Sequence, residues 1–301
     1  MNRRIVLTIL FVSLVVPCAG AWADDTAIAQ KLKDLGGMVT ESGGTVTKVE
    51  FRECSKLGEP EFQAIAQLHG LKELILYNHC HGLDDAALAS LSKLSNLETL
   101  GTDGIQVTDE GLKQLAHLKN LREAKFFHTS FGAKGFTGVG FGALAACPRL
   151  EHLTVAGISM GDEGFAAIAT ITQLKELRTW HTYQTAAAFE QIASMPNLQT
   201  LYLGQRLPHG PGHPPSLTEA TIPVLARIKT LQWLTLTEGR FSAGPLAQLK
   251  ALPNLKKLVI SECEITPEDV EQVRKDLPNV KVEFKPITEE QRAKVEKFLK
   301  E

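Results

Sequence analysis

Histidine, cysteine and acidic side chains are the groups with which this chain could coordinate a metal. The run His79-Cys80-His81, with Cys54 earlier in the sequence, offers the imidazole and thiolate ligands that zinc prefers. Its spacing matches no established zinc pattern, and in a strand His79 and His81 share one face while Cys80 lies on the other. We therefore predict no metal site and no cofactor.

A catalytic site would require a nucleophile or an acid–base pair held in a pocket. Suitable groups are present in His152, His181, Glu176 and Asp103, but no catalytic motif surrounds them. We interpret the chain as a non-catalytic protein, with hydrolysis as the least favoured alternative. The other candidate chemistry is binding through large aromatic residues, and the elements that carry them must be placed first.

The N-terminus has the pattern of a secretory signal peptide. Arg3 and Arg4 precede an apolar run over residues 5–16, and Ala21-Trp22-Ala23 fits a small-x-small cleavage site. The pattern predicts removal of residues 1–23 and export to the periplasm or the extracellular space. Cys18 leaves open a lipid anchor in place of free secretion. No later stretch is apolar enough to predict a transmembrane segment.

The charge balance argues against nucleic acid as a partner. The chain has 32 Lys and Arg against 34 Asp and Glu, a net charge of −2. Loss of residues 1–23 removes two arginines and no acid, so the remaining chain is more acidic still. A binder of phosphate backbones normally carries a basic surplus.

An LxxLxL pattern recurs nine times, with a base period of 24 residues and two insertions. In a short strand its first, fourth and sixth positions face inward, and the third, fifth and seventh face out. The copies begin at Val46, Leu71, Leu97, Leu121, Leu150, Leu174, Leu198, Leu231 and Leu255.

Each strand is followed by apolar residues at helical spacing, such as Leu112, Leu115 and Leu118. N-cap residues precede these predicted helices: Asp84, Thr108, Thr218, Ser242 and Thr266. One strand and one helix cannot bury their apolar faces alone, so the copies must stack side by side into a parallel sheet.

With these repeats the chain resembles the leucine-rich-repeat superfamily, of the bacterial exported type with LxxLxLxxxxVTDxGLxxLxxLxx repeats. Val107-Thr108-Asp109-Glu110-Gly111-Leu112 matches that consensus closely. The resemblance implies an α/β solenoid with a curved parallel sheet on the concave side and helices on the convex side. The ninth repeat position, often asparagine in the superfamily, carries none here, so we expect no asparagine ladder along the turns.

Four segments follow from this interpretation. They are a signal peptide at 1–23, an N-terminal cap of a short helix and a hairpin strand at 24–45, the repeat domain at 46–284, and a C-terminal capping helix at 285–301. Two insertions, Gly132 to Gly142 and Gln205 to Ser216, emerge after their strands and are expected to frame one rim of the sheet.

The outward strand positions define the predicted ligand-binding face. Aromatic and histidine side chains occupy many of them, where a purely structural sheet would carry small or charged residues. The alternative is that some of these rings only cover the insertions or one another. The predicted site residues are Tyr77, Phe127, His152, Trp180, His181, Tyr202 and Trp233.

We therefore expect a binding module that recognises a protein or peptide ligand. Two alternatives stay open: carbohydrate recognition by the same aromatic rings, and a passive structural role in the cell envelope.

Cys54 and Cys80 occupy nearly equivalent places in adjacent repeats, about one strand spacing of 4.8 Å apart, so a disulfide between them is possible. The alternative is two small buried hydrophobic residues.

Overall fold

The structure is a computed structural model that describes residues 20–208 and 214–299. Most of the predicted signal peptide, including Cys18, lies outside the described residues, and Gly20 begins the first helix. Its cleavage and the predicted export therefore stay predictions. Among the described residues, no helix is both long enough and apolar enough to cross a bilayer.

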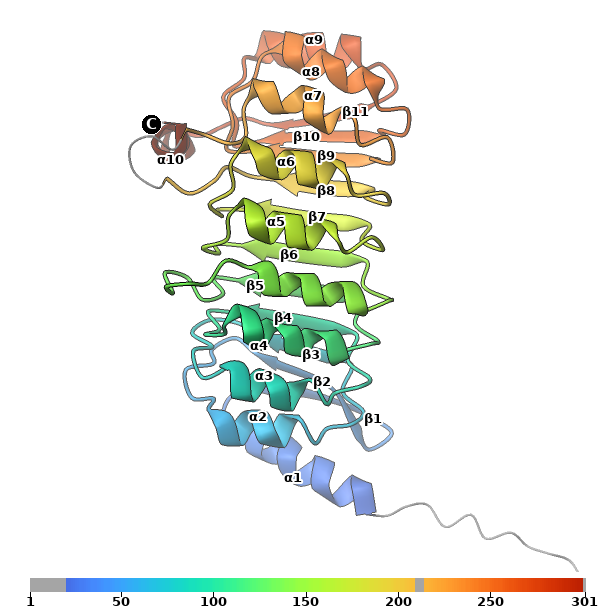
Figure 1. Cartoon of the computed structure of the whole chain (residues 1–301), viewed down its shortest axis with the longest axis vertical. Helices are drawn as coiled ribbons and strands as arrows, with labels where there is room; N and C mark the ends of the chain where they lie inside the picture. The colour runs from blue at the N-terminus through green and yellow to red at the C-terminus, as the bar shows by residue number, and fades with distance from the viewer. Residues whose placement is uncertain (1–19, 209–213, 300–301) are drawn as a thin grey trace, which may run out of the picture.

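Within the described residues, one sheet of eleven strands runs the length of the molecule in sequence order (Figure 1). The first two strands are antiparallel and each later neighbour pair is parallel. The strands are β1 Met38–Ser42, β2 Thr45–Phe51, β3 Glu73–Leu76, β4 Thr99–Asp103, β5 Glu123–Phe127, β6 His152–Ala156, β7 Glu176–Trp180, β8 Thr200–Leu203, β9 Trp233–Thr237, β10 Lys257–Ser261 and β11 Lys281–Lys285.

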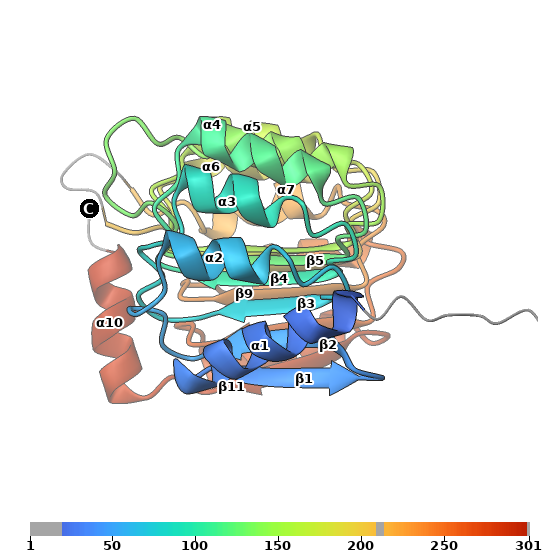
Figure 2. The same cartoon turned by 90° about the horizontal axis from the view of Figure 1, so that it is seen from below.

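Helices cover one face of this sheet, and the view along the stack shows them as a separate layer (Figure 2). The α-helices are α1 Gly20–Asp34, α2 Glu59–Ile65, α3 Asp85–Leu91, α4 Asp109–Leu112, α5 Asp162–Ala169, α6 Ala186–Ala193, α7 Ile222–Leu225, α8 Ala243–Leu246, α9 Pro267–Asp276 and α10 Glu289–Leu299. The 3₁₀ helices are η1 Lys113–His117, η2 Val139–Ala146, η3 Glu219–Thr221 and η4 Ala247–Ala251.

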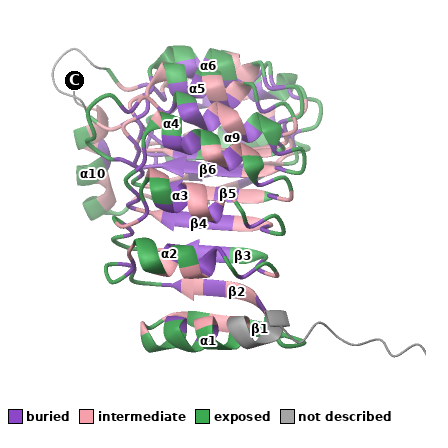
Figure 3. Ribbon diagram, turned by 60° about the horizontal axis from the view of Figure 1, so that its bottom comes forward, coloured by how far each residue is buried: buried purple, intermediate pink, exposed green. Residues whose placement is uncertain are grey.

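The predicted α/β solenoid is confirmed, and its strands pair without slipping in register. Leu74 lies beside Leu100, and Leu177 lies between Leu153 and Leu201. These inward side chains are fully buried or nearly so. Figure 3 shows the buried layer between strands and helices, with the exposed surface on the outer faces of the helices. Each fully buried leucine contributes roughly 1.5–3 kcal/mol to stability.

Asparagines at a position other than the ninth join neighbouring repeats, and we call them the asparagine ladder. They lie in the turn just before four of the strands, where each side chain donates to a turn carbonyl of the preceding repeat. Asn96 Nδ2 donates to His69 at 2.9 Å and Asn120 Nδ2 to Ser95 at 2.8 Å. Asn197 and Asn254 do the same with Thr172 and Lys229. Stacked repeats place each donor beside a carbonyl that the sheet leaves unpaired.

A second ladder joins the starts of successive helices. The Asp85 carboxylate accepts from the backbone N–H and the hydroxyl of Thr108 in the next repeat, at 2.8 and 2.6 Å. Asp162 accepts from Thr185 in the same way. The acid that follows one N-cap residue therefore fixes the N-cap of the neighbouring helix.

Three of the five predicted N-caps act as expected. The side chains of Asp84, Thr108 and Thr266 accept from a backbone N–H in the first turn of their own helices. Ser242 instead donates both its N–H and its hydroxyl to Glu219 of the preceding repeat. The Thr218 side chain makes no cap hydrogen bond, and its N–H is held by the hydroxyl of Thr221.

At the N-terminal end, α1 and the β1–β2 hairpin lie beyond the first repeat (Figure 1). At the other end, β11 is the last strand of the described sheet. The helix expected as a cap, α10, does not cover β11. It lies beside the carboxyl ends of the strands (Figures 1 and 2), because its side chains pair with residues of earlier repeats, as described below.

The first insertion fills the core as well as the rim. Phe136 and Phe141 are buried, with ring centroids 6.4 Å apart, and Phe141 packs on Phe126 at 5.0 Å. Phe131, just before the predicted insertion, is half-exposed.

In the second insertion residues 209–213 lie outside the described residues. The buried Gln205 side chain joins its two ends, accepting from the N–H groups of Ser216 and Leu217 and donating to the Leu217 carbonyl.

Candidate functional site

Four of the predicted site residues form a continuous row of rings, which we call the aromatic ladder: Tyr77, Phe127, Trp180 and Tyr202. Ring centroids lie 6.0 Å apart for Tyr77 and Phe127, 6.1 Å for Phe127 and Trp180, and 5.2 Å for Trp180 and Tyr202. All four side chains keep partial exposure to solvent. The sheet thus presents one apolar stripe that crosses the strands from β3 to β8.

Strand register explains why these rings touch. Tyr77, Phe127 and Trp180 follow the same inward leucine position on β3, β5 and β7, with the short side chains of Asp103 and Ala156 between them. Adjacent strands lie about 4.8 Å apart, so rings two strands apart can lean together over the short residue. Ala156 is only 2% exposed for this reason. The rings therefore cover one another in part, and still present their outer edges to solvent.

Trp233 lies apart from the ladder. It begins β9, is 53% exposed, and carries the Lys257 ammonium 5.8 Å from its ring centroid. It lines a depression of about 600 Å³ together with Tyr202, Lys285 and Gln291. The last of these belongs to α10, so the C-terminal helix forms part of the wall of this depression.

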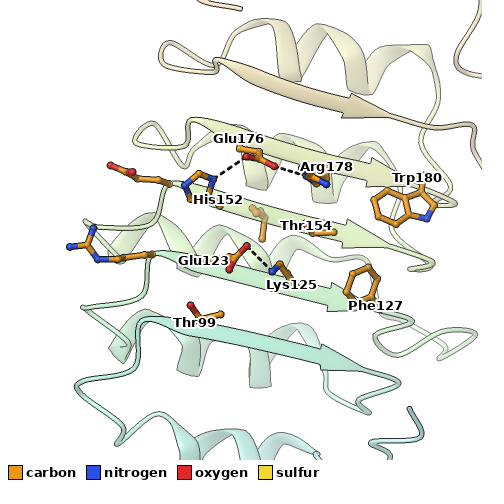
Figure 4. A pocket seen from close by; sticks show the side chains of 12 residues that line it. Thr99, Glu123, Lys125, Phe127, His152, Thr154, Glu176, Arg178 and Trp180 are labelled. Atoms are coloured by element: carbon orange, nitrogen blue, oxygen red, sulfur yellow. Dashed lines mark hydrogen bonds and ion pairs between the residues drawn. The ribbon is translucent and has the colours of Figure 1, made fainter. Parts of the chain in front are cut away.

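A depression of similar volume, about 600 Å³, lies over β4 to β7 and includes Phe127, His152 and Trp180 of the predicted site (Figure 4). Phe127 and Trp180 stand at the carboxyl end of their strands, and the charged residues lie behind them. Lys125 pairs with Glu123 at 2.8 Å, and Glu176 pairs with both His152, at 3.1 Å, and Arg178. The floor is the nearly buried Thr154.

Burial and charge shift several titratable groups of this face. Burial alone would raise the pKa of Glu176, but the hydrogen bonds and positive charges of Arg178 and His152 outweigh it and hold that pKa below its usual range. Burial raises the pKa of the Tyr77 and Tyr202 phenols. Both tyrosines are therefore neutral at ordinary pH and present an aromatic ring with a hydroxyl.

His181, also predicted for the site, lies off the concave face. Its φ of 54° places it in a left-handed turn directly after β7, so its side chain points toward the rim. There its Nε2 lies 2.9 Å from the carboxylate of Glu238, which is 4% exposed. His181 and Glu238 are thus structural partners at the rim, and His181 leaves the candidate binding face.

The same rim residues hold α10. Phe298 packs on the His181 ring with centroids 5.0 Å apart, and Lys294 Nζ lies 3.3 Å from Glu238 Oε1. Val295 is fully buried. Sequence reasoning missed this docking, since the pairs join residues far apart in the chain.

The metal interpretation of His79-Cys80-His81 gains no support. Cys80 is buried, His79 pairs with Glu53 at 3.1 Å, and His81 Nδ1 lies 2.9 Å from the Gly104 carbonyl oxygen. Among the described residues no group of three or more metal-ligating side chains comes together.

Cys54 and Cys80 are free, fully buried thiols in the structure. They are neighbours, as their places in adjacent repeats predict, and the hydrogen bond with Cys54, reinforced by burial, raises the pKa of Cys80. The structure therefore has the reduced pair in place of the disulfide considered from the sequence.

The residues considered for catalysis do form histidine–carboxylate pairs, one of them with His128, which was not among those considered. Asp103 pairs with His128, His152 with Glu176 and His181 with Glu238. A catalytic histidine would also contact a nucleophile. Within residues 20–208 and 214–299, the hydrogen bonds of these three histidine rings are made with carboxylates and none with a hydroxyl or thiol. Each pair instead ties one repeat to another.

Comparison with known proteins places these features in context. The family described as the leucine-rich repeats of FBD-associated F-box protein At5g56370 matches residues 62–217. None of the curated proteins matches the chain. Similar solved structures include two proteins of Listeria monocytogenes. An internalin C2 is 18% identical with a TM-score of 0.47, and the match covers 87% of this chain and 93% of that one. An internalin (inlF) is 15% identical with a TM-score of 0.41, over 92% and 93% of the two chains.

Proposed function

Because the chain belongs to the leucine-rich-repeat superfamily, whose repeats present a ligand surface and not an enclosed active site, we propose that it is a non-catalytic module that binds a protein or peptide through its concave sheet. The observation that carries this proposal is the aromatic ladder. A stripe of four partly exposed rings lies between depressions of about 600 Å³. Rigid aromatic rings beside concave surface are typical of binding hot spots.

The tilt of the rings favours protein over carbohydrate as the ligand. Neighbouring rings of the ladder stand at 73°, 53° and 61° to one another. At these angles the four rings do not form one flat platform on which sugar rings could stack, whereas protein side chains pack against ring edges and faces alike. The ion pairs beside the ladder also offer donors and acceptors for a polypeptide.

We also propose that the protein, once exported, acts in the periplasm or outside the cell. The basic residues and apolar run of the N-terminus support this placement. Fractionation of the producing cells, with the mass of the mature chain, tests it. A chain that retains residues 1–23 in the cytoplasm would rule it out.

A pull-down from the producing cell's envelope and medium tests the binding face. The full chain is compared with a Trp180→Ala, Tyr202→Ala, Trp233→Ala variant shown to be folded by circular dichroism. We expect a partner that the native chain retains and the variant loses. The control variant changes three exposed residues of the helical side, Lys113→Ala, Glu163→Ala and Gln191→Ala. Equal retention by all three proteins, or by none, would make the ladder structural.

A further inference from the structure

The depression over β6 changes in chemistry along the strand direction, with positive charges at one place and aromatic rings further along. Three residues lie side by side in strand register on its floor and walls: Lys125 on β5, Thr154 on β6 and Arg178 on β7. Two residues further along the same strands, Phe127 and Trp180 meet over Ala156. Figure 4 shows the cationic row behind the two rings.

The cationic row is a place where a carboxylate would be held from both sides. Thr154 is short and lies between two long cationic side chains whose strands are about 9.6 Å apart, twice the strand spacing. Thr154 lines the depression and is 6% exposed, so a ligand that enters the depression meets this side chain on its floor. A ligand carboxylate above it can accept from the hydroxyl and from both cations.

The glutamates of the depression do not block this position. Glu123 and Glu176 stand two residues back on their strands, about 6.6 Å away along the strand direction, where Glu123 pairs with Lys125 and Glu176 with His152 and Arg178. Glu151, which lies just before β6, pairs with Lys175. The depression carries as many glutamates as lysines and arginines, so selectivity depends on this arrangement and not on net charge. The pair of Lys125 with Glu123 lies at the surface and contributes little free energy, so Lys125 can turn to a ligand at small cost. When Arg178 turns to a ligand, Glu176 keeps its contact with His152.

The ring pair supplies the second half of the site. Phe127 and Trp180 present an apolar surface over Ala156, two residues along β6 from Thr154. In an extended peptide, side chains two residues apart lie on the same side and about 6.6 Å from each other. That spacing equals the distance from the cationic row to the ring pair.

We propose that the concave face recognises an extended peptide segment that carries an acidic residue and, two positions away, a large apolar residue. The acid lies over Thr154 between Lys125 and Arg178, and the apolar side chain packs on Phe127 and Trp180. This inference rests on the proposed function and specifies its ligand.

Selection of random twelve-residue peptides displayed on phage against the full chain tests it. We expect enrichment of Asp or Glu two positions from a large apolar residue. In a selected peptide made synthetically, Glu→Gln should weaken binding about tenfold, the loss of one charge-assisted interaction. The Lys125→Gln, Arg178→Gln double variant should lose the preference for the acid and keep the preference for the apolar residue. Lys48→Gln, which removes an ion-paired lysine of β2 on the same face, is the matched control.

Three results would overturn the inference. Enriched peptides without an acid, an acid preference that survives in the double variant, or no enrichment at all would each do so. The first two leave the proposed function intact, provided that the selected peptides lose binding when Trp180 is replaced. The pull-down described above decides the proposed function independently of this selection.

Discussion

His181 and Phe298 pack ring against ring, with centroids 5.0 Å apart, and so join the turn after β7 to the C-terminal helix. Glu238 completes the junction, since its nearly buried carboxylate contacts both His181 and Lys294. Through this contact α10 flanks the carboxyl ends of the strands and helps to wall the depression next to Trp233.

Loss of the Phe298 ring should release α10 without unfolding the solenoid. Phe298→Ala removes the contact with His181, and α10 is then held mainly by Val295 and its ion pairs. Amide hydrogen exchange is expected to rise in residues 289–299 and to stay unchanged in β7 and β9. Lys297→Ala, on the exposed side of the same helix, should change neither. Unaltered exchange in α10 of the Phe298 variant would show that the ring does not hold the helix.

The asparagine ladder should contribute to stability one repeat at a time. Asn197→Ala removes the 2.9 Å hydrogen bond to the Thr172 carbonyl and should lower the free energy of unfolding by about 1 kcal/mol. Urea unfolding measures the change. Lys93→Ala, at an exposed site in another repeat, is the control. If both variants lose the same amount, the ladder has no specific role.

The stability of the concave face should depend on pH through Glu176. Its pKa lies below the usual value of 4.5, so its ionised form stabilises the fold above that value. The contribution disappears as the pH falls through the lowered pKa of the folded state. Glu176→Gln should therefore be less stable than the native chain at pH 7, and the difference should shrink below about pH 4.5. Unfolding curves with a constant difference from pH 7 to pH 3 would contradict this account.

The cysteines should be unreactive in the folded chain. Burial raises the pKa of Cys147 to about 11 and that of Cys263 to about 12. The thiolate is the reactive form, so alkylation by iodoacetamide at pH 7 should be slow until denaturant is added. Peptide mass mapping after alkylation also reports on Cys54 and Cys80. A peptide that links them would show a disulfide and would contradict the reduced pair of the structure.

The fold was predictable because its determinants are local. LxxLxL fixes which strand positions face the core, and the same alternation placed Tyr77, Phe127 and Trp180 on one outward row. The asparagine ladder had a visible signal too. An asparagine directly precedes the first leucine of four repeats, whereas the superfamily often has its asparagine at the ninth repeat position. The four residues are Asn96, Asn120, Asn197 and Asn254.

The rest of the fold and of the candidate site depends on contacts between residues far apart in the chain, which no local sequence pattern contains. His181 leaves the concave face because a left-handed turn follows β7. The placement of α10 depends on Glu238 and His181, which come from two distant repeats. Ser242 gives up its cap role because Glu219 of the previous repeat competes for its hydroxyl. Such contacts form only when the stack is assembled.

The most direct test of a concave binding face is a photoreactive amino acid placed at single positions of the full chain. Thr154, on the floor of the depression beside the aromatic ladder, is compared with Glu163, exposed on α5 of the helical face. After irradiation in the producing cell's envelope and medium, cross-linked partners are identified by mass spectrometry. We predict a defined partner from position 154 and none from position 163. A partner captured only from position 163 would contradict the account.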